Sequence, residues 1–277
     1  FVIACDSTDM VAEMERIHKT SATVTAALGR LLSAGAMMGS MMKGDNDLIT
    51  LQIMGDGPIG GIVVTADSLG HVKGYCYNPD VNIPPKANGH LDVSGSIGNG
   101  TLQVIRDSGL KDPYVGSIDL VSGEIAEDIT YYYATSEQIP SAVALGVLVG
   151  TEGVRQAGGL IIQLLPFATD EVITALENKL AKMPSMTAML SSGLKPEDIL
   201  EGLFGDMDLV IRDTLPIEFK CNCDRERVAK AVVSIGAKDI QSMIDDNEPI
   251  EVKCQFCNTP YKYSVEDLKE MLKYARP

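Results

Sequence analysis

FKCNCDRER (residues 219–227) and VKCQFCNTP (residues 252–260) hold four of the six cysteines of this 277-residue chain. The first stretch contains a C-x-C pair, the second a C-x-x-C pair, and the segment 224–253 separates the two pairs. Four thiolates at about 2.3 Å from a zinc ion form a tetrahedron, and two closely spaced pairs can each supply one edge of it. We therefore predict one zinc ion per chain, held by four ligands. These ligands are Cys221, Cys223, Cys254 and Cys257.

The metal is expected to determine whether the C-terminal region folds. A hydrophobic core of so short a segment rarely supplies more than about 3–5 kcal/mol, whereas structural zinc can contribute on the order of 10–16 kcal/mol. The three histidines, at positions 18, 71 and 90, all lie far ahead of the cysteines, so an all-thiolate site needs no outside ligand. Four unligated cysteines or two structural disulfides are the alternatives.

Ahead of the cysteines, the sequence has the period of short helices. TDEVITALENKLAKM (residues 169–183) begins with an N-capping threonine and two acids, and its apolar side chains fall on one face. SMTAMLSSG (185–193) and KPEDILEGLFG (195–205) follow, the latter with a proline in its first turn. Flexible apolar side chains in this region suit an adaptable binding surface, or the ordinary contacts of helices with a core. They are Met183, Met186, Met189, Leu190, Leu194, Leu203, Phe204 and Met207.

The region 1–168 is rich in strand patterns separated by Gly, Asn, Asp and Pro. A spacing of roughly ten residues favours a largely antiparallel sheet. The segments are 47–54, 60–67, 71–78, 114–121, 127–135, 142–149 and 160–166. The predicted fold class is α+β. Its parts are a mixed N-terminal core domain over 1–168, a helical, Met-rich connector over 169–215 and a C-terminal zinc-binding, redox-switch module over 216–277.

One segment of the first domain, residues 20–42, is long enough to span a bilayer. Its Ala, Gly, Ser and Thr residues make it only mildly hydrophobic, and Arg30 falls in its middle. A charge at that depth of a membrane costs about 2.5–3.5 kcal/mol or more. A helix buried inside the domain, with small residues that permit close packing, is the better interpretation.

A glycine motif nearby has the spacing of a dinucleotide-binding loop. Gly55, Gly57 and Gly60 match G-x-G-x-x-G after a strand-like run. That function requires a helix directly after the loop. Here Pro58 interrupts the loop and IVVTAD continues as a strand, so we predict a hairpin turn.

The charge of the chain limits its partners. The formal net charge is −15, of which residues 217–277 carry −1 and residues 1–216 carry −14. Phosphate backbones and anionic membrane surfaces are poor partners for such a molecule, and we expect neither a nucleic-acid nor a membrane partner. Closely spaced cysteine pairs without a disulfide-dense scaffold are typical of metal or redox sites in the cytosol, so a cytoplasmic location is expected.

The C-x-C and C-x-x-C pairs, at this spacing and near the C-terminus, resemble those of the redox-regulated heat-shock chaperones of about 33 kDa. The resemblance covers essentially the whole chain. Segments that carry it, in order, are ALGRLLSAGAMMG, GDGPIGGIVV, HVKGYCYNP, SGEIAEDITYYYATSEQIPSAVALGVLV and AGGLIIQLLP. It implies an ATP-independent holdase rather than an enzyme, inactive while it is reduced and zinc-bound.

The resemblance also implies how such a protein is switched on. Oxidants combined with heat or unfolding stress release zinc and unfold the tail and the connector, and the activated form, a homodimer, binds unfolding client proteins. The four cysteines are then both zinc ligands and redox-active thiols, bridged within each pair as Cys221–Cys223 and Cys254–Cys257. Bridges that close such short loops restrict the chain little, which suits a reversible switch.

Two alternative functions use the same cysteines. A zinc ribbon that binds nucleic acid is disfavoured by the charge. A thiol–disulfide oxidoreductase is suggested by CQFC, but its C-x-x-C usually lies at a helix N-terminus, whereas Cys257 precedes a turn and strand-like residues. Cys5 and Cys76 lie outside the motif and are expected to be buried, inert strand cysteines.

Overall fold

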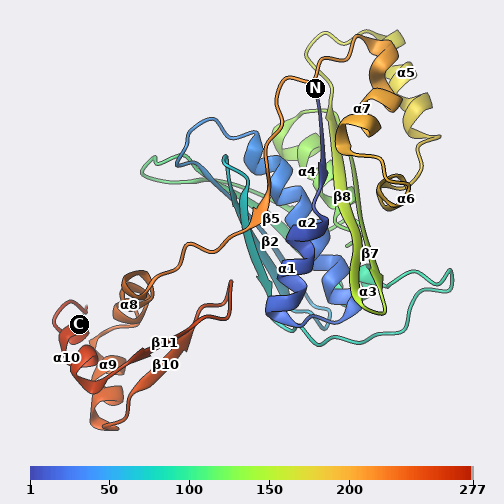
Figure 1. Ribbon diagram of the computed structural model, residues 1–277. Helices are drawn as coiled ribbons and strands as arrows, with labels where there is room; N and C mark the ends of the chain where they lie inside the picture. Colours follow the sequence, from blue (N-terminus) through green and yellow to red (C-terminus); the bar gives the residue numbers. More distant parts are fainter. Residues whose placement is uncertain (276–277) are drawn as a thin grey trace. The chain divides into compact units, whose positions relative to one another are not determined.

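The computed structural model describes residues 1–275 and divides into two compact units, Phe1–Lys220 and Cys221–Pro277. The larger unit contains two β-sheets with a long helix between them (Figure 1). The fold is α+β with mostly antiparallel strands, as the sequence predicts. The connector helices belong to this larger unit, so the domain boundaries at residues 168 and 215 stay a prediction.

The first sheet has six strands in the order β6-β5-β2-β3-β4-β9. All neighbours are antiparallel except β4 and β9, which pair in parallel over two residues. The glycine motif forms the turn between β2 and β3, where Gly55 N donates to Gly60 O and Gly60 has a φ of +75°, so the predicted hairpin is confirmed. The strands are β2 Leu48–Gly55, β3 Gly61–Asp67, β4 His71–Cys76, β5 Gly100–Asp107, β6 Tyr114–Asp119 and β9 Glu218–Phe219.

The second sheet has three antiparallel strands in the order β1-β8-β7. Its first strand pairs with a segment that follows much later in the chain: Val2 lies opposite Ile162. Helix α1 contacts β8, and the short helix α3 contacts the long helix between the sheets. The bounds are β1 Val2–Asp6, β7 Ser141–Gly150, β8 Gly153–Gln163, α1 Thr8–His18 and α3 Val93–Ile97.

Helix α2, Ala22–Ser40, is the buried helix expected from residues 20–42. Its small residues let both sheets approach. A Cβ on Gly35 would lie 2.7 Å from Val64 of β3, and one on Gly29 would lie 3.0 Å from Val147 of β7. Within the described residues, no helix has the length and apolar character needed to cross a membrane.

The charge at the middle of α2 is compensated inside the protein. The Arg30 guanidinium donates to the Glu124 carboxylate at 2.7 Å, and the Lys86 ammonium binds the same carboxylate. Burial opposes ionisation of Glu124, but the bonds from Lys86 and Arg30 lower its pKa to about 2. The arginine thus anchors the loop before α4 to the central helix.

The strand predicted over 127–135 is wrong. Those residues form α4, Ala126–Tyr132, which continues as a π-helix over Tyr133–Glu137. The buried Asp128 carboxylate accepts hydrogen bonds from the backbone N–H groups of Val121, Ser122, Gly123 and Ile125, and it thereby organises the turn that begins the helix. This capping overrides the β preference of the isoleucine, threonine and tyrosines that follow.

The connector helices pack on the three-stranded sheet, on the side away from α2 (Figure 1). Helix α6 contacts β7 and β8, and α7 contacts β1. An apolar cluster joins them: Leu160, Ile162, Met186, Met189, Leu190, Ile199 and Phe204 are buried in it. The three helices that the sequence predicts are α5 Asp170–Leu180, α6 Met186–Ser191 and α7 Pro196–Phe204. A 3-10 turn, η2, follows over Gly205–Met207.

The smaller unit has its own core. Two helices precede a β-hairpin, and a third follows it. A capping box begins this third helix: Asp267 N donates to the Ser264 hydroxyl and Ser264 N donates to the Asp267 carboxylate. The elements are α8 Arg225–Val233, α9 Ala237–Asp245, β10 Ile250–Lys253, β11 Pro260–Tyr263 and α10 Val265–Leu272. The buried core residues are Val228, Val232, Ile240, Tyr263, Leu268 and Met271.

Candidate metal centre

The four cysteines predicted as ligands come together in the smaller unit. Cys221 and Cys223 lie just before α8, and Cys254 and Cys257 lie in the loop that joins β10 to β11. All four Sγ atoms are within 4.8 Å of one another, and each side chain is partly buried. Of all the cysteine, histidine, aspartate and glutamate side chains among the described residues, these four form the group that is compact enough to hold a metal ion.

The sulfur geometry fits zinc. Ligands at about 2.3 Å from a tetrahedral ion lie about 3.8 Å from each other. Cys221 Sγ is 3.7 Å from Cys254 Sγ, and Cys223 Sγ is 3.3 Å from Cys257 Sγ. A small inward or outward adjustment of these sulfurs gives a regular tetrahedron with an all-thiolate donor set, which soft and borderline metals such as zinc prefer.

The C-x-x-C pair is shaped by its hairpin loop. Cys254 N donates to Thr259 O at 3.0 Å, and Asn258 N donates to Cys254 O at 2.8 Å. Asn258 has a φ of +57°, a left-handed conformation that asparagine tolerates better than most residues. The tight turn brings the two sulfurs together. Since Cys257 leads into this turn and β11, the pair lacks the helix N-terminus that usually activates the thiol of an oxidoreductase.

The C-x-C pair is fixed by the start of α8. The Asp224 side chain caps this helix by accepting from Arg227 N at 2.8 Å, and the Arg227 guanidinium donates to Asn222 O at 3.0 Å. The single residue between the two cysteines is therefore tied to the first turn of a helix. Both sulfurs are held by elements of the same small unit as the hairpin.

Two hydroxyl groups next to the sulfurs were not expected from the sequence. The Tyr261 hydroxyl lies 3.1 Å from Cys223 Sγ, and Thr259 Oγ1 lies 3.2 Å from Cys257 Sγ. Both follow Cys257 at two-residue intervals, so the alternation of side chains at the start of β11 could have pointed to them. Such outer hydrogen bonds orient metal ligands and tune their basicity.

These contacts change the ionisation of the thiols. Burial raises the pKa of Cys221 and Cys223, although the Tyr261 hydroxyl opposes the rise at Cys223. Burial also acts on Cys257, but hydrogen bonds with Thr259 and the neighbouring sulfurs outweigh it and lower the pKa to about 7. The hydrogen bond between the Tyr261 hydroxyl and Cys223 raises the pKa of Tyr261, so this hydroxyl stays protonated and can donate to the sulfur.

The other two cysteines lie in strands of the larger unit, and their predicted burial is confirmed. Cys5 is in β1 and 8% exposed, and Cys76 ends β4 and is 9% exposed. Burial raises the pKa of Cys5 to about 12 and that of Cys76 to about 11. Both therefore remain thiols at neutral pH, the form that reacts slowly with oxidants.

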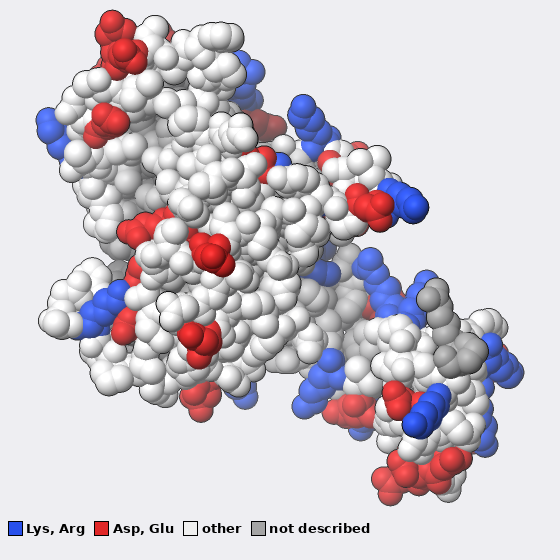
Figure 2. Space-filling view, turned by 180° about the vertical axis from the view of Figure 1, so that it is seen from behind, with Lys and Arg blue, Asp and Glu red and all other residues white. Residues whose placement is uncertain are grey.

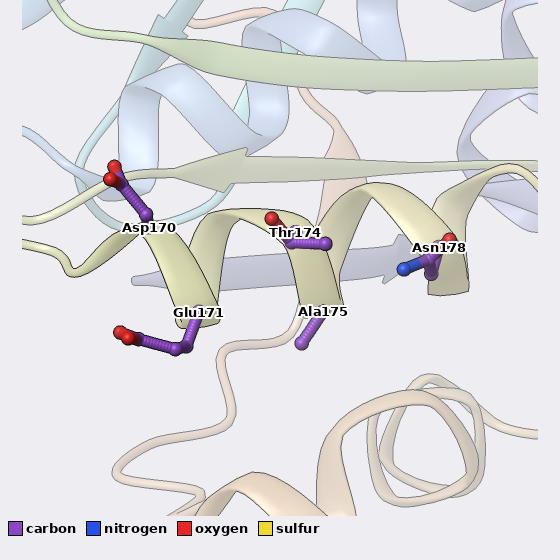
Figure 3. A pocket seen from close by; sticks show the side chains of 5 residues that line it. All are labelled: Asp170, Glu171, Thr174, Ala175 and Asn178. Atoms are coloured by element: carbon purple, nitrogen blue, oxygen red, sulfur yellow. The ribbon is translucent and has the colours of Figure 1, made fainter.

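Two surface features lie apart from the cysteine cluster. In Figure 2, acidic groups are scattered over the face of the larger unit with basic groups around its margins, and the smaller unit carries both signs. A depression along α5 is lined by Asp170, Glu171, Thr174, Ala175 and Asn178 (Figure 3). Its two carboxylates occupy the first helical turn, where they complement the helix dipole, so it adds no candidate site.

Comparison with known proteins gives consistent matches. A family model described as Hsp33 protein matches residues 2–264. The 33 kDa chaperonin of Lachnoclostridium phytofermentans is 59% identical over 97% of this chain and 92% of its own length, and that of Clostridioides difficile is 50% identical over 95% and 91%. The crystal structure of the 33 kDa chaperonin from Thermotoga maritima has a TM-score of 0.90 at 38% identity, covering 99% of this chain and 93% of that one.

Proposed function

Because the chain belongs to the Hsp33 family, we propose that it is a redox-regulated, ATP-independent chaperone whose switch is the four-cysteine centre. The observation that carries this proposal is the gathering of Cys221, Cys223, Cys254 and Cys257 within 4.8 Å in a unit with a small core. Relatives named 33 kDa chaperonin support the binding of unfolding proteins.

In the reduced protein, the four sulfurs would hold one zinc ion, which would supply a crosslink between the start of α8 and the hairpin. Cys221 and Cys223 contribute from one side of this crosslink, and Cys254 and Cys257 from the other. The Tyr261 and Thr259 hydroxyls steady two of the sulfurs. Six buried side chains alone give a unit of this size little stability, so loss of the crosslink would unfold it.

Oxidation would remove the ligands. Hydrogen peroxide takes two electrons and two protons from each pair of thiols and leaves as two waters, so two equivalents form two disulfides. We propose that the bridges form within pairs, Cys221–Cys223 and Cys254–Cys257, because these leave the helix and the hairpin unlinked. Peptide mass spectrometry of the oxidised protein should find these two bridges. A dominant bridge between the pairs would retain the crosslink and contradict the release mechanism.

The activated chain would then hold clients through apolar surface, as a homodimer in the cytoplasm and without catalytic turnover. The apolar cluster between the connector and the three-stranded sheet is the candidate source of that surface. The negative charge of residues 1–216 would keep a loaded complex in solution. It also leads us to expect no binding of DNA or RNA, even at low salt, and the setting of Cys257 predicts no turnover in insulin reduction.

Replacing Cys254 by serine tests the centre directly. The reduced variant should lose zinc and its C-terminal unit should become sensitive to protease, while residues 1–168 stay protected. Cys76→Ala, which removes a cysteine of β4, should keep stoichiometric zinc. Zinc content is measured beside the suppression of light scattering by an aggregating client, before and after peroxide. A Cys254→Ser protein with full zinc and a protected tail would refute the four-cysteine assignment.

A further inference from the structure

Methionines are concentrated where the connector meets the three-stranded sheet. Met183, Met186, Met189 and Met207 all belong to the apolar cluster that also contains Leu160 and Ile162 of β8. The sheet side of this contact is aliphatic, and most of the readily oxidised atoms lie on the connector side. The thioethers are not required by the zinc centre, which lies in the other unit.

These methionines differ in how accessible they are. Met186 and Met189, on α6, are 2% and 7% exposed, so the sheet shields their sulfurs. Met183 follows the end of α5, and Met207 ends the η2 turn; both are only partly buried at the edge of the cluster. An oxidant in solution therefore reaches Met183 and Met207 first.

The edge of the cluster is also the part that is held least firmly. Helix α5 has no buried residue and presents polar side chains to solvent (Figure 3). An ion pair joins it to η2: the Lys179 ammonium lies 2.8 Å from the Asp206 carboxylate, which is 69% exposed. Exposed pairs of this kind contribute little to stability. Apolar contact by Leu176, Leu180, Met183 and Met207 must therefore supply much of the docking.

Oxidation of a thioether works against such contact. Hydrogen peroxide or hypochlorous acid transfers one oxygen atom to the sulfur, which loses two electrons. Hydrogen peroxide leaves as water, and hypochlorous acid leaves as chloride and a proton. The sulfoxide is polar and a strong hydrogen-bond acceptor, and it disrupts apolar interfaces that methionine stabilises. No cysteine takes part in this step.

We propose that the connector is a second oxidant sensor, separate from the cysteines. Sulfoxides at Met183 and Met207 loosen the connector from the three-stranded sheet. The loosened connector exposes Met186 and Met189 to the oxidant, and sulfoxides at these two residues keep the connector from docking again. The methionines of the main core do not respond: Met10, Met14, Met37 and Met38 are at most 2% exposed. Release of the connector does not depend on the proposed function, but its effect on client holding does.

The test uses full-length, reduced, zinc-loaded protein. Met183→Gln/Met207→Gln imitates the polarity of two sulfoxides without any oxidant, and Met183→Leu/Met207→Leu keeps the apolar volume without sulfur. Protease cleavage between residues 169 and 207 should be about tenfold faster in the glutamine variant than in the leucine variant, because cleavage follows the population of the open form. Zinc should stay bound in both. Equal cleavage rates would overturn the inference.

An oxidant arm tests the order of events. After a short pulse of hypochlorite, mass spectrometry should find sulfoxide at Met183 and Met207 before Met186 and Met189, with faster cleavage in the parent than in the leucine variant. Both proteins undergo the same thiol chemistry, so the difference reports the methionines. Met54→Leu, on β2, should behave as the parent. Unmodified Met183 and Met207 at a dose that oxidises Met54 would refute the proposal. A connector that is released but does not suppress light scattering by a client would support the methionine proposal and count against the proposed chaperone function instead.

Discussion

Gly146 of β7 lies directly beneath α6, and an alanine there would push on the connector alone. A Cβ at this position would lie 2.8 Å from Thr187 Cγ2, 3.3 Å from Thr187 N and 3.5 Å from Met186 Cβ. All three atoms belong to Met186 and Thr187, the first two residues of α6, and none belongs to the sheet or to α2. The added methyl group therefore strains the docking of the connector and leaves the zinc centre untouched.

The expected magnitude follows from the contact with Thr187 Cγ2, which is shorter than real Cβ contacts in proteins. The helix must move or Thr187 must change its rotamer, and overpacking of this kind costs about 1–3 kcal/mol. A shift of this size changes an equilibrium by roughly 5- to 150-fold. The population of protein with an undocked connector should rise by that factor in Gly146→Ala, while zinc remains bound.

Gly202 of α7 offers a matched control, because a Cβ there would have nothing within 4 Å. Alanine in a helix interior is more stable than glycine by roughly 0.5–1 kcal/mol, so Gly202→Ala should stabilise the connector. Hydrogen exchange of the amides in α6 should be faster than in the parent for Gly146→Ala and slower or unchanged for Gly202→Ala. After peroxide, the first variant should hold clients at a lower temperature than the parent. Parent-like exchange in Gly146→Ala would refute the view that α6 packs on this strand.

Two further perturbations test other parts of the structure. Leu203→Asp places a charge at the edge of the apolar cluster, so it should lower the dose of oxidant or the temperature needed for client holding. Light scattering by an aggregating client measures the holding, and a chromogenic chelator follows zinc release in parallel. An unchanged threshold would show that the connector is not the regulated element. Glu124→Gln should lower the thermal midpoint at pH 7 by about 2–4 °C. The pKa of Glu124 is depressed in the folded state, so its contribution to stability is present above the ordinary pKa of glutamate and lost as the pH falls towards 2. The thermal midpoints of the parent and of Glu124→Gln should therefore converge near that pH. A difference in midpoint that widens in acid would contradict the role given to the Glu124 ion pairs.

Local signals in the sequence predicted much of this structure. The cysteine spacing predicts which four sulfurs meet, since each pair is brought together by one turn or helix start. The small residues of α2 predict a buried helix, because Gly29 and Gly35 are needed only where other elements come close. The short helices of the connector follow from signals such as the Ser185 cap of α6 and Pro196 in the first turn of α7.

What the sequence did not predict depends on distant contacts. The pairing of β1 with β8 joins segments that lie far apart in the chain, and nothing local to Val2 indicates it. Strand β5 and helix α1 were not predicted, and residues 127–135 were assigned to the wrong element because the four donors to Asp128 come from a preceding loop whose path was unknown. The side of the sheet that α6 covers is likewise set by Gly146 and Gly158, whose role is visible only in the folded chain.

Strand β9 marks the last place where the larger unit holds the backbone before the first cysteine ligand. It pairs with β4 over two residues only, and Glu218 N donates to Gly70 O and Lys220 N to Val72 O. Residues 208–217 before it form neither helix nor strand. Fraying that starts at the cysteines and passes this short fastening therefore meets no regular element until η2 and Met207. Loss of structure that begins at the cysteines therefore reaches the last residues of the connector, 208–215, before it meets the helices that pack on the three-stranded sheet.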